Sequence, residues 1–446
     1  MEGGTLAKRS GSGSGSGGVR QSSVRVAVRC RPLNSEEKRA GEASTVDIQG
    51  RTVTLGPGPR AHSYAQNDED DGSSVFAYDY AFGAASDQLS IFASCGAPLI
   101  KELLDGFNAT IFAYGQTGSG KTHTMIGSAL EPGLVPRSTW FLFERLQALG
   151  AFDASDDART PRSTSDDFDG EGEGGDGEGG GGRRTFKLSA TYLQIYNETL
   201  IDMLAENPAE LKIRTSPEHG IFVAGLSEHP VRSPADVLEL LERGNKQRTT
   251  AATRMNATSS RSHAVFTLVL EQEIPVAKGS GDGATGNAEG EAEVASESEA
   301  SGDGEGASEG EGASVRPGRI RRLRSKINLV DLAGSERAKL SGADEDPSLM
   351  KECVNINKSL AALGNVIASL SEGKSIHVPY RESRLTQLLE QSLGGNAQTI
   401  MINNISPRHV HHAETLSTLH WAKRAQSIVN VSVVGEATDS STAMEK

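Results

Sequence analysis

Cysteine, aromatic residues and long apolar runs are all scarce in this sequence of 446 residues. Its three cysteines, Cys30, Cys95 and Cys353, lie far apart and fit neither a CxxC pair nor a metal-ligand spacing, which indicates unreactive thiols in a reducing compartment. No apolar run approaches the roughly 18 residues of a membrane span, and the start of the chain lacks the apolar core of a secretory signal. These absences argue against secreted and membrane-spanning classes and predict a cytoplasmic or nuclear protein.

Basic residues are missing from two low-complexity runs, 165–182 and 279–313, which hold seven and ten acidic residues. The formal net charge of −14 becomes +3 when these 17 acidic residues are left out. The remainder is slightly basic, so the low pI does not argue against an acidic partner. Both runs bury too little apolar area to fold, and they predict disordered inserts at about 151–184 and 275–318.

Strand and helix patterns alternate along the rest of the chain. Residues 1–22 are rich in Ser and Gly and are predicted to be disordered. Strands are predicted at 23–34, 109–115, 185–204, 263–274 and 325–336, and helices at 86–108, directly after residue 122 with a continuation through 135–150, at 233–250 and over much of the last hundred residues. This alternation predicts an α/β fold, a three-layer sandwich with a central, mostly parallel sheet flanked by helices.

The stretch "GQTGSGKT", residues 115–122, has the GxxxxGKT form of a phosphate-binding loop. Glycines at 115, 118 and 120 permit the backbone N–H groups to wrap a phosphate. Lys121 would reach the β- and γ-phosphates, and the hydroxyl of Thr122 would bind Mg²⁺. A strand precedes the loop and a helix follows it, as this motif requires. The predicted nucleotide contacts are Gly115, Gln116, Thr117, Gly118, Ser119, Gly120, Lys121 and Thr122.

Two further motifs would sense a γ-phosphate. In "LVDLAGSE" an apolar strand delivers Asp331 toward the water shell of the metal, and Gly334 lets a backbone N–H approach the phosphate. The run "NATSSRSH", residues 256–263, is dense in hydroxyls and has one fixed cation. Alone, such a run is more typical of a helix cap or turn. Together with the other two motifs it indicates a phosphate-sensing loop.

Five motifs in order resemble a kinesin motor domain: "IFAYGQTGSGKTHTM", "NATSSRSHAVFT", "INLVDLAGSER", "NINKSLAALGNVIASL" and "HVPYRESRLTQLLEQSLGGNAQT". The similarity covers residues 24–434 apart from the inserts and is greatest to spindle-associated kinesins with N-terminal motors. It implies the P-loop NTPase fold, with a motor domain over 23–425, a neck linker over 426–434 and a disordered tail over 435–446.

The resemblance assigns residues around the nucleotide. It places Arg29, Arg31, Pro32 and His123 beside the adenine. In the first switch, Ser260 would join Thr122 as a Mg²⁺ ligand, with Asp331 acting through water, while Asn256 and Ser259 would lie near the γ-phosphate and the attacking water. Arg261 would pair with Glu336 when the two switches close.

The resemblance also predicts a microtubule-binding surface and a moving segment. Its track-facing side chains are Lys339, Lys358, His377, Tyr380, Arg381 and Arg384. In the linker, Ile428 would enter a docking pocket. Gly435 stands where many relatives have an Asn that latches the docked linker, and the Ser/Gly-rich N-terminus offers little to pair with it. We therefore expect ATPase activity and microtubule binding with weaker force production.

The resulting hypothesis is a microtubule-stimulated ATPase and plus-end-directed motor that uses ATP and Mg²⁺ and works on the cytoskeleton, with the spindle as one candidate location. A competing hypothesis is a binding module that holds microtubules without stepping. A helicase is disfavoured because no aromatic and basic groove for a single strand is present, so we expect no nucleic-acid partner. No heptad array follows residue 434, so this chain is expected to be monomeric.

The inserts leave alternatives open. They can be tolerated loop expansions, or they can repel the acidic tails of tubulin. The basic run "RPGRIRRLRSK" beside the second insert can pair with the acidic residues or contact another partner.

Overall fold

The computed structural model describes residues 18–58, 73–151, 184–207, 209–216, 220–255, 259–275, 320–336, 347–373 and 377–436. Of residues 250–255, 259 and 347–357 only the backbone is described. Most of both predicted inserts and of the predicted terminal segments therefore lies outside the described residues. The described flanks place the first insert between a helix and a strand and the second between two strands.

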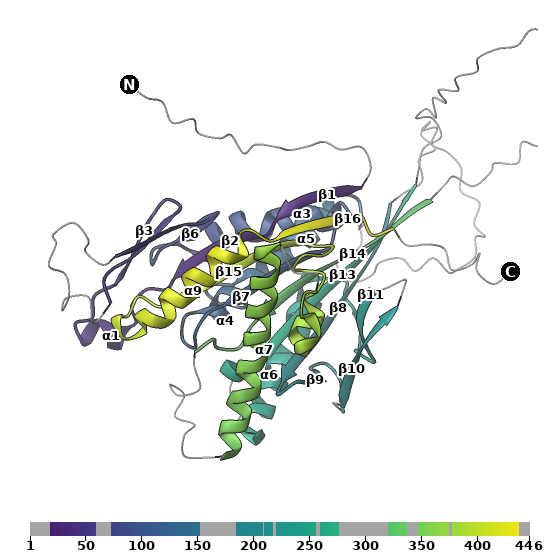
Figure 1. Cartoon of the computed structure of the whole chain (residues 1–446). Coiled ribbons are helices and arrows are strands. Elements are labelled where there is room, and N and C mark those ends of the chain that lie inside the picture. Colours follow the sequence, from purple (N-terminus) through teal and green to yellow (C-terminus); the bar gives the residue numbers. More distant parts are fainter. Residues whose placement is uncertain are drawn as a thin grey trace, which may run out of the picture.

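A mixed β-sheet forms the centre of the protein (Figure 1). In spatial order its strands are β11 (Gly220–Ala224), β10 (Glu210–Ser216), β9 (Thr199–Asp202), β8 (Thr185–Tyr196), β13 (His263–Pro275), β14 (Ile320–Asp331), β7 (Ala109–Tyr114), β15 (Gln398–Ile405), β2 (Arg25–Cys30) and β6 (Tyr80–Phe82), with β12 (His229–Pro230) paired to β8. Neighbours are parallel from β14 to β6 and antiparallel from β11 to β14.

The sheet was predicted to be mostly parallel, but its strands from β11 to β14 are antiparallel, so the prediction is wrong for this half. The expected strand over 185–204 is a hairpin, because Asn197 and Glu198 both adopt left-handed backbone angles, with φ of 52° and 61°, and reverse the chain. The consecutive strands β13 and β14 also pair with each other, from Ala264 opposite Asp331 to Pro275 opposite Ile320. Consecutive paired strands are antiparallel unless a crossover connects them.

Helices cover both faces of the sheet. One face carries α2 (Gln88–Ile91), the π-helical turn η2 (Phe92–Gly96), α3 (Ala97–Leu104), α5 (Leu134–Ala148) and α6 (Pro234–Met255). The other carries α7 (Pro347–Glu372), α8 (Arg384–Leu388) and α9 (His412–Ala425). Strand residues alternate between the two cores: Ile111 packs in the first and Phe112 in the second. This arrangement confirms the three-layer sandwich.

Helix ends follow from local sequence. Ser233 and Asp236 form reciprocal side-chain to backbone bonds at the start of α6, as its capping signal predicts. The helix after the phosphate loop, α4 (Lys121–Met125), was expected to continue into α5 but ends early. Gly127, with φ of 76°, and Pro132 form an isolated bridge that separates the two helices.

The remaining elements lie at the edges. A small antiparallel sheet contains β3 (Val46–Gln49), β4 (Thr52–Leu55) and β5 (Ser74–Ala77), and short helices are α1 (Ser35–Arg39), η3 (Ser259–Arg261), η6 (Tyr380–Glu382) and η7 (His409–His411). A separate ribbon pairs β1 (Val19–Ser23) with β16 (Val429–Val433) over five residues of each. Residues 19–22 were predicted to be disordered; they form most of β1, because the linker segment supplies backbone partners that sequence alone does not reveal.

Two cysteines behave as the sequence predicts. Cys30 and Cys95 are buried and free, and burial raises the pKa of each thiol to about 12. The side chain of Cys353 lies outside the described residues. In the part of the chain that the structure describes, no helix is long and apolar enough to cross a membrane.

Candidate nucleotide site and adjoining surfaces

The phosphate loop connects the buried strand β7 to α4, as the motif predicts. The buried ammonium of Lys121 donates to the carbonyls of Gly115 at 2.8 Å and Gln116 at 2.9 Å. Burial lowers the pKa of Lys121, and the carboxylates of Asp331 and Glu336 act against that shift. Gly115 has a φ of 142°, and a Cβ there would stand 2.1 Å from the carbonyl oxygen of Asn404 on β15. Only glycine permits this approach of the loop to the sheet.

Asp331 links the end of β14 to the loop. Its Oδ2 atom accepts a hydrogen bond from the hydroxyl of Thr122 at 2.8 Å. Its Oδ1 atom is buried and has no hydrogen-bond partner among the described residues. A buried carboxylate oxygen with spare capacity beside a Thr hydroxyl fits the hard oxygen ligand shell that Mg²⁺ requires. The residues present therefore suit the metal predicted from the sequence.

The two predicted switch segments contact each other, and the second of them also contacts the loop. The N–H of Gly334, expected to approach a γ-phosphate, donates to the carbonyl of Ser260 at 2.8 Å. The Glu336 carboxylate accepts the N–H of Thr117 at 2.7 Å and also accepts its hydroxyl. The predicted ion pair between Arg261 and Glu336 stays a prediction for the nucleotide-bound protein. Asn256 lies outside the described residues, and the side chain of Ser259 is not described.

The predicted adenine edge contains an ion pair that the sequence did not reveal. Arg31 donates from Nε to the Gly118 carbonyl at 2.7 Å and from its two terminal nitrogens to Glu37 at 2.7 Å and 2.6 Å. Glu37 also closes a capping box with Asn34 at the start of α1. The bond from Arg31, reinforced by other groups, lowers the pKa of Glu37 to about 2. This network fixes one side of the phosphate loop.

The other predicted adenine residues differ in exposure. Arg29 is buried and donates to Gln88 at 3.1 Å and Thr124 at 2.8 Å, which places its guanidinium against α4. Pro32 is exposed, and the ring of His123 is 44% exposed at the rim of the loop. Contact of any of these three residues with adenine stays a prediction.

Sequence reasoning missed two buried residues that connect the switches. Arg248 of α6 bonds Asp331 at 3.2 Å and the Ser262 carbonyl at 2.9 Å. His263 accepts the N–H of Ala333 on Nδ1 at 3.0 Å and contacts the Ser359 hydroxyl through Nε2 at 2.8 Å. Burial lowers the pKa of His263 to about 3, so its ring is neutral and carries its proton on Nε2. The only signal in the sequence was the position of His263 at the end of "NATSSRSH".

The predicted microtubule-binding residues gather where α7, η6 and α8 pack together. Lys358, His377 and Arg381 are exposed, and Arg384 is half-buried. Tyr380 differs, because its phenol donates to the Leu393 carbonyl at 2.5 Å and burial raises its pKa to about 12. Tyr380 thus fixes η6 against the core. Lys339 lies outside the described residues.

The linker segment, residues 426–434, lies along the core. Ile428 is buried, and Asn430 donates to the carbonyls of Ser392 at 2.9 Å and Ala397 at 2.7 Å. The expectation that the N-terminus offers little to this segment is wrong, since β1 pairs with all of β16. Gly435 was expected to leave the linker without the Asn side chain that holds it in many relatives. Its backbone nevertheless forms hydrogen bonds to Gly106 and Arg324 of the core.

These features define a P-loop nucleotide-binding protein whose loop contacts the segment 331–336, which in turn contacts Ser260. The family described as the kinesin motor domain matches residues 29–428, and the chain belongs to that family. Kinesin-like protein klp-20 of Caenorhabditis elegans is 35% identical over 418 residues, which cover 93% of this chain and 52% of that protein. Kinesin-related protein 1 of Dictyostelium discoideum is 37% identical over 430 residues, 93% of this chain and 16% of the relative. The chain thus spans about half or less of these relatives.

Solved structures agree with this membership. A KIF14 dimer with both heads bound to a microtubule and AMP-PNP is 35% identical, with a TM-score of 0.69 over 94% of this chain and 97% of that chain. The structure of a fast kinesin is 31% identical, with a TM-score of 0.68 over 95% of this chain and 97% of the other.

Proposed function

We propose that this chain is a microtubule-stimulated ATP hydrolase that moves along microtubules toward their plus end. One observation carries the proposal: the loop and both switches are joined at one place. Thr122 bonds Asp331 at 2.8 Å, Gly334 bonds Ser260 at 2.8 Å, and Glu336 bonds Thr117 at 2.7 Å. A γ-phosphate bound by the loop would therefore contact all three segments. Its loss would remove contacts from both switches and allow them to change conformation.

The chain would act mainly by positioning and electrostatics. Backbone N–H groups of the loop would bind the phosphates, and Lys121 would exchange its two carbonyl partners for phosphate oxygens. Bound Mg²⁺ would be held by the hydroxyls of Thr122 and Ser260 with Asp331 through water, and would offset phosphate charge. Asn256 and Ser259 would orient the attacking water, and closure of Arg261 onto Glu336 would fix its line of attack.

Microtubule binding would use the exposed cations on α7 and η6. Lys358 and Arg381 are solvent-exposed at this surface and suit an acidic track. The KIF14 structure, which contains a microtubule, supports this partner by similarity. Localisation to the cytoskeleton would follow. Association with the spindle and the monomeric state of this chain rest on the sequence alone.

Movement would depend on the linker segment. Pairing of β16 with β1 and burial of Ile428 support a docked state of this segment. Release of this segment in another nucleotide state would be an order-to-disorder switch. The plus-end direction rests on the resemblance, because the linker follows the motor core.

Filament gliding tests the proposal. Protein fixed to a surface through its C-terminal end should move polarity-marked microtubules with the minus end leading when ATP is present. Filaments held in a nucleotide-dependent way without movement would favour the non-stepping binding module. Filaments that do not bind would contradict both.

A further inference from the structure

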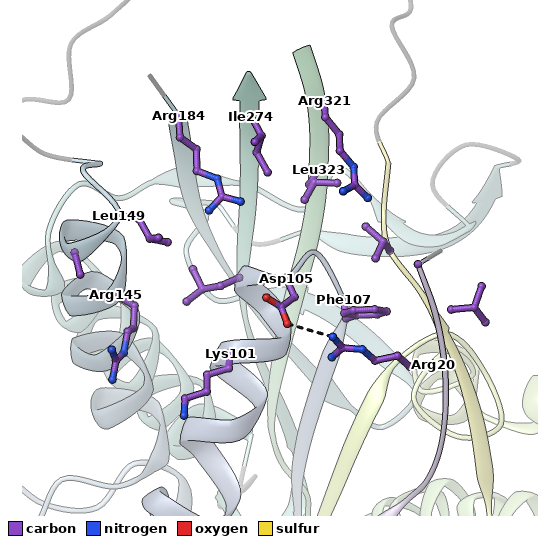
Figure 2. Close-up of a pocket in the computed structure, with 15 residues that line it drawn as sticks. Arg20, Lys101, Asp105, Phe107, Arg145, Leu149, Arg184, Ile274, Arg321 and Leu323 are labelled. Carbon is purple, nitrogen blue, oxygen red and sulfur yellow. Dashed lines mark hydrogen bonds and ion pairs between the residues drawn. The ribbon is translucent and has the colours of Figure 1, made fainter. Parts of the chain in front are cut away.

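A basic pocket of about 800 Å³ lies where the first insert joins the folded core (Figure 2). Lys101 of α3 and Asp105 just after it line the pocket, as do Arg145 of α5 and Leu149 just after that helix. Arg184, directly before β8, also lines it. Residues of β1, β13 and β14 complete the wall. This pocket is separate from the phosphate loop, none of whose residues lines it.

The pocket has more positive charge than the described residues neutralise. Its cations are Arg20, Lys101, Arg145, Arg184 and Arg321, against the single carboxylate of Asp105. Arg20 pairs with Glu102 and, at 3.4 Å, with Asp105, and Arg321 pairs with Glu436 at 3.0 Å. Lys101, Arg145 and Arg184 form no ion pair with another described residue, and the buried Nε of Arg184 has no hydrogen-bond partner there. Such a pocket is suited to a ligand with several carboxylates.

The chain itself supplies such a ligand at the pocket rim. The described core ends at Ala151 and resumes at Arg184, and both Leu149 and Arg184 line the pocket. The run 165–182, with seven acidic residues and no cation, ends two residues before Arg184. A ligand tethered this closely has an effective concentration of order millimolar. The other acidic run, 279–313, ends seven residues before the strand that carries Arg321.

We propose that the acidic run 165–182 binds in this basic pocket. The bound carboxylates pair with Lys101, Arg145 and Arg184. Val19 of β1 and Val434 beside β16 also line the pocket, so binding is expected to favour the docked linker. That consequence rests on the proposed motor function, whereas the binding itself does not.

Zero-length coupling of carboxylates to amines by a carbodiimide tests the binding in the whole chain. Trypsin separates the two acidic runs, because 165–182 lies in peptide 163–183 and 279–313 in peptide 279–319. We expect Lys101 to be coupled to peptide 163–183 at least roughly fivefold more than exposed Lys212 is, because the tether favours the nearby site. High salt should reduce this coupling.

Charge reversal provides the matched variants. Arg145→Glu should reduce the Lys101 coupling severalfold, while Arg214→Glu, exposed on β10 outside the pocket, should leave it unchanged. Three results would overturn the proposal. Lys101 could couple to peptide 279–319 instead, or Lys101 and Lys212 could couple equally to peptide 163–183. In a mixture of isotope-labelled and unlabelled protein, coupling could also occur only between different copies of the chain. The rate of ATP turnover without microtubules, measured on the same samples, should be the same in wild type, Arg145→Glu and Arg214→Glu.

Discussion

The backbone N–H of Gly435 donates to the carbonyl of Gly106 at 3.0 Å, directly after the linker segment 426–434. The Gly435 carbonyl in turn accepts the N–H of Arg324 at 2.7 Å. A Cβ at Gly435 would stand 2.1 Å from the Arg324 carbonyl oxygen. Close backbone contact thus fastens the linker at a position where the resemblance leads one to expect a side chain.

Gly435→Ala should therefore weaken docking. A spin label on a cysteine introduced at Val433, which is 42% exposed, should become more mobile, and gliding should slow severalfold with microtubule affinity retained. Gly83→Ala is the control, because a Cβ there meets only Ile48 at an ordinary 3.8 Å. Equal label mobility in Gly435→Ala and wild type would show that this backbone contact does not hold the linker.

Glu336→Ala should separate nucleotide binding from hydrolysis. It removes the acceptor for Thr117 and the predicted partner of Arg261, while the phosphate loop stays intact. We expect ATP binding close to wild type and turnover lower by about 100-fold or more, as for loss of one preorganised transition-state contact. Glu336→Gln keeps a hydrogen-bond acceptor for Thr117 but removes the negative charge. Its turnover therefore distinguishes the effect of losing the hydrogen bond to Thr117 from the effect of losing the predicted ion pair with Arg261. Surviving turnover in Glu336→Ala would show that the switch pair is wrongly assigned.

Arg248→Ala should destabilise the fold, because Asp331 would keep a buried charge without its cation. Both side chains are only 5% exposed, and loss of one member of such a pair costs about 3 to 5 kcal/mol. Urea unfolding measures the change in the free energy of unfolding. Lys246→Ala on the same helix is the control, since its side chain is 74% exposed and pairs with Glu242 at the surface. Similar unfolding midpoints for the two variants would contradict the structural role of Arg248.

His263 should make stability fall as the pH is lowered. The pKa of His263 is about 3 in the folded chain and near 6.5 when unfolded, so only the unfolded state gains its proton between those values. This group should remove about 1 kcal/mol of stability between pH 7 and pH 5.5. His263→Asn keeps an acceptor for the Ala333 N–H without titrating, so its stability gap to wild type should narrow over that range. A constant gap would mean that His263 does not titrate as inferred.

The sequence predicted the parts of the site that lie within continuous motifs. Lys121, Thr122, Asp331 and Gly334 each belong to one, and the structure brings these motifs together. Arg248 could not be found in this way, because its partner Asp331 is 83 residues away and its own surroundings look like an ordinary helix.

Pairing between strands that are distant in the chain could not be predicted from the sequence either. The strand β1 depends on β16 from the other end of the chain, and the antiparallel half of the sheet depends on a hairpin turn made without glycine at Asn197 and Glu198. Helix and strand periodicity gives element type and core faces, but it does not identify which strands become neighbours.

The most direct test of the central claim is the rate of ATP hydrolysis with and without microtubules at low salt, where contacts between exposed charges are screened least. We predict stimulation of at least severalfold, abolished by Lys121→Ala and reduced by Arg381→Ala, whose side chain is exposed on the proposed track surface. A rate that microtubules leave unchanged would contradict the account.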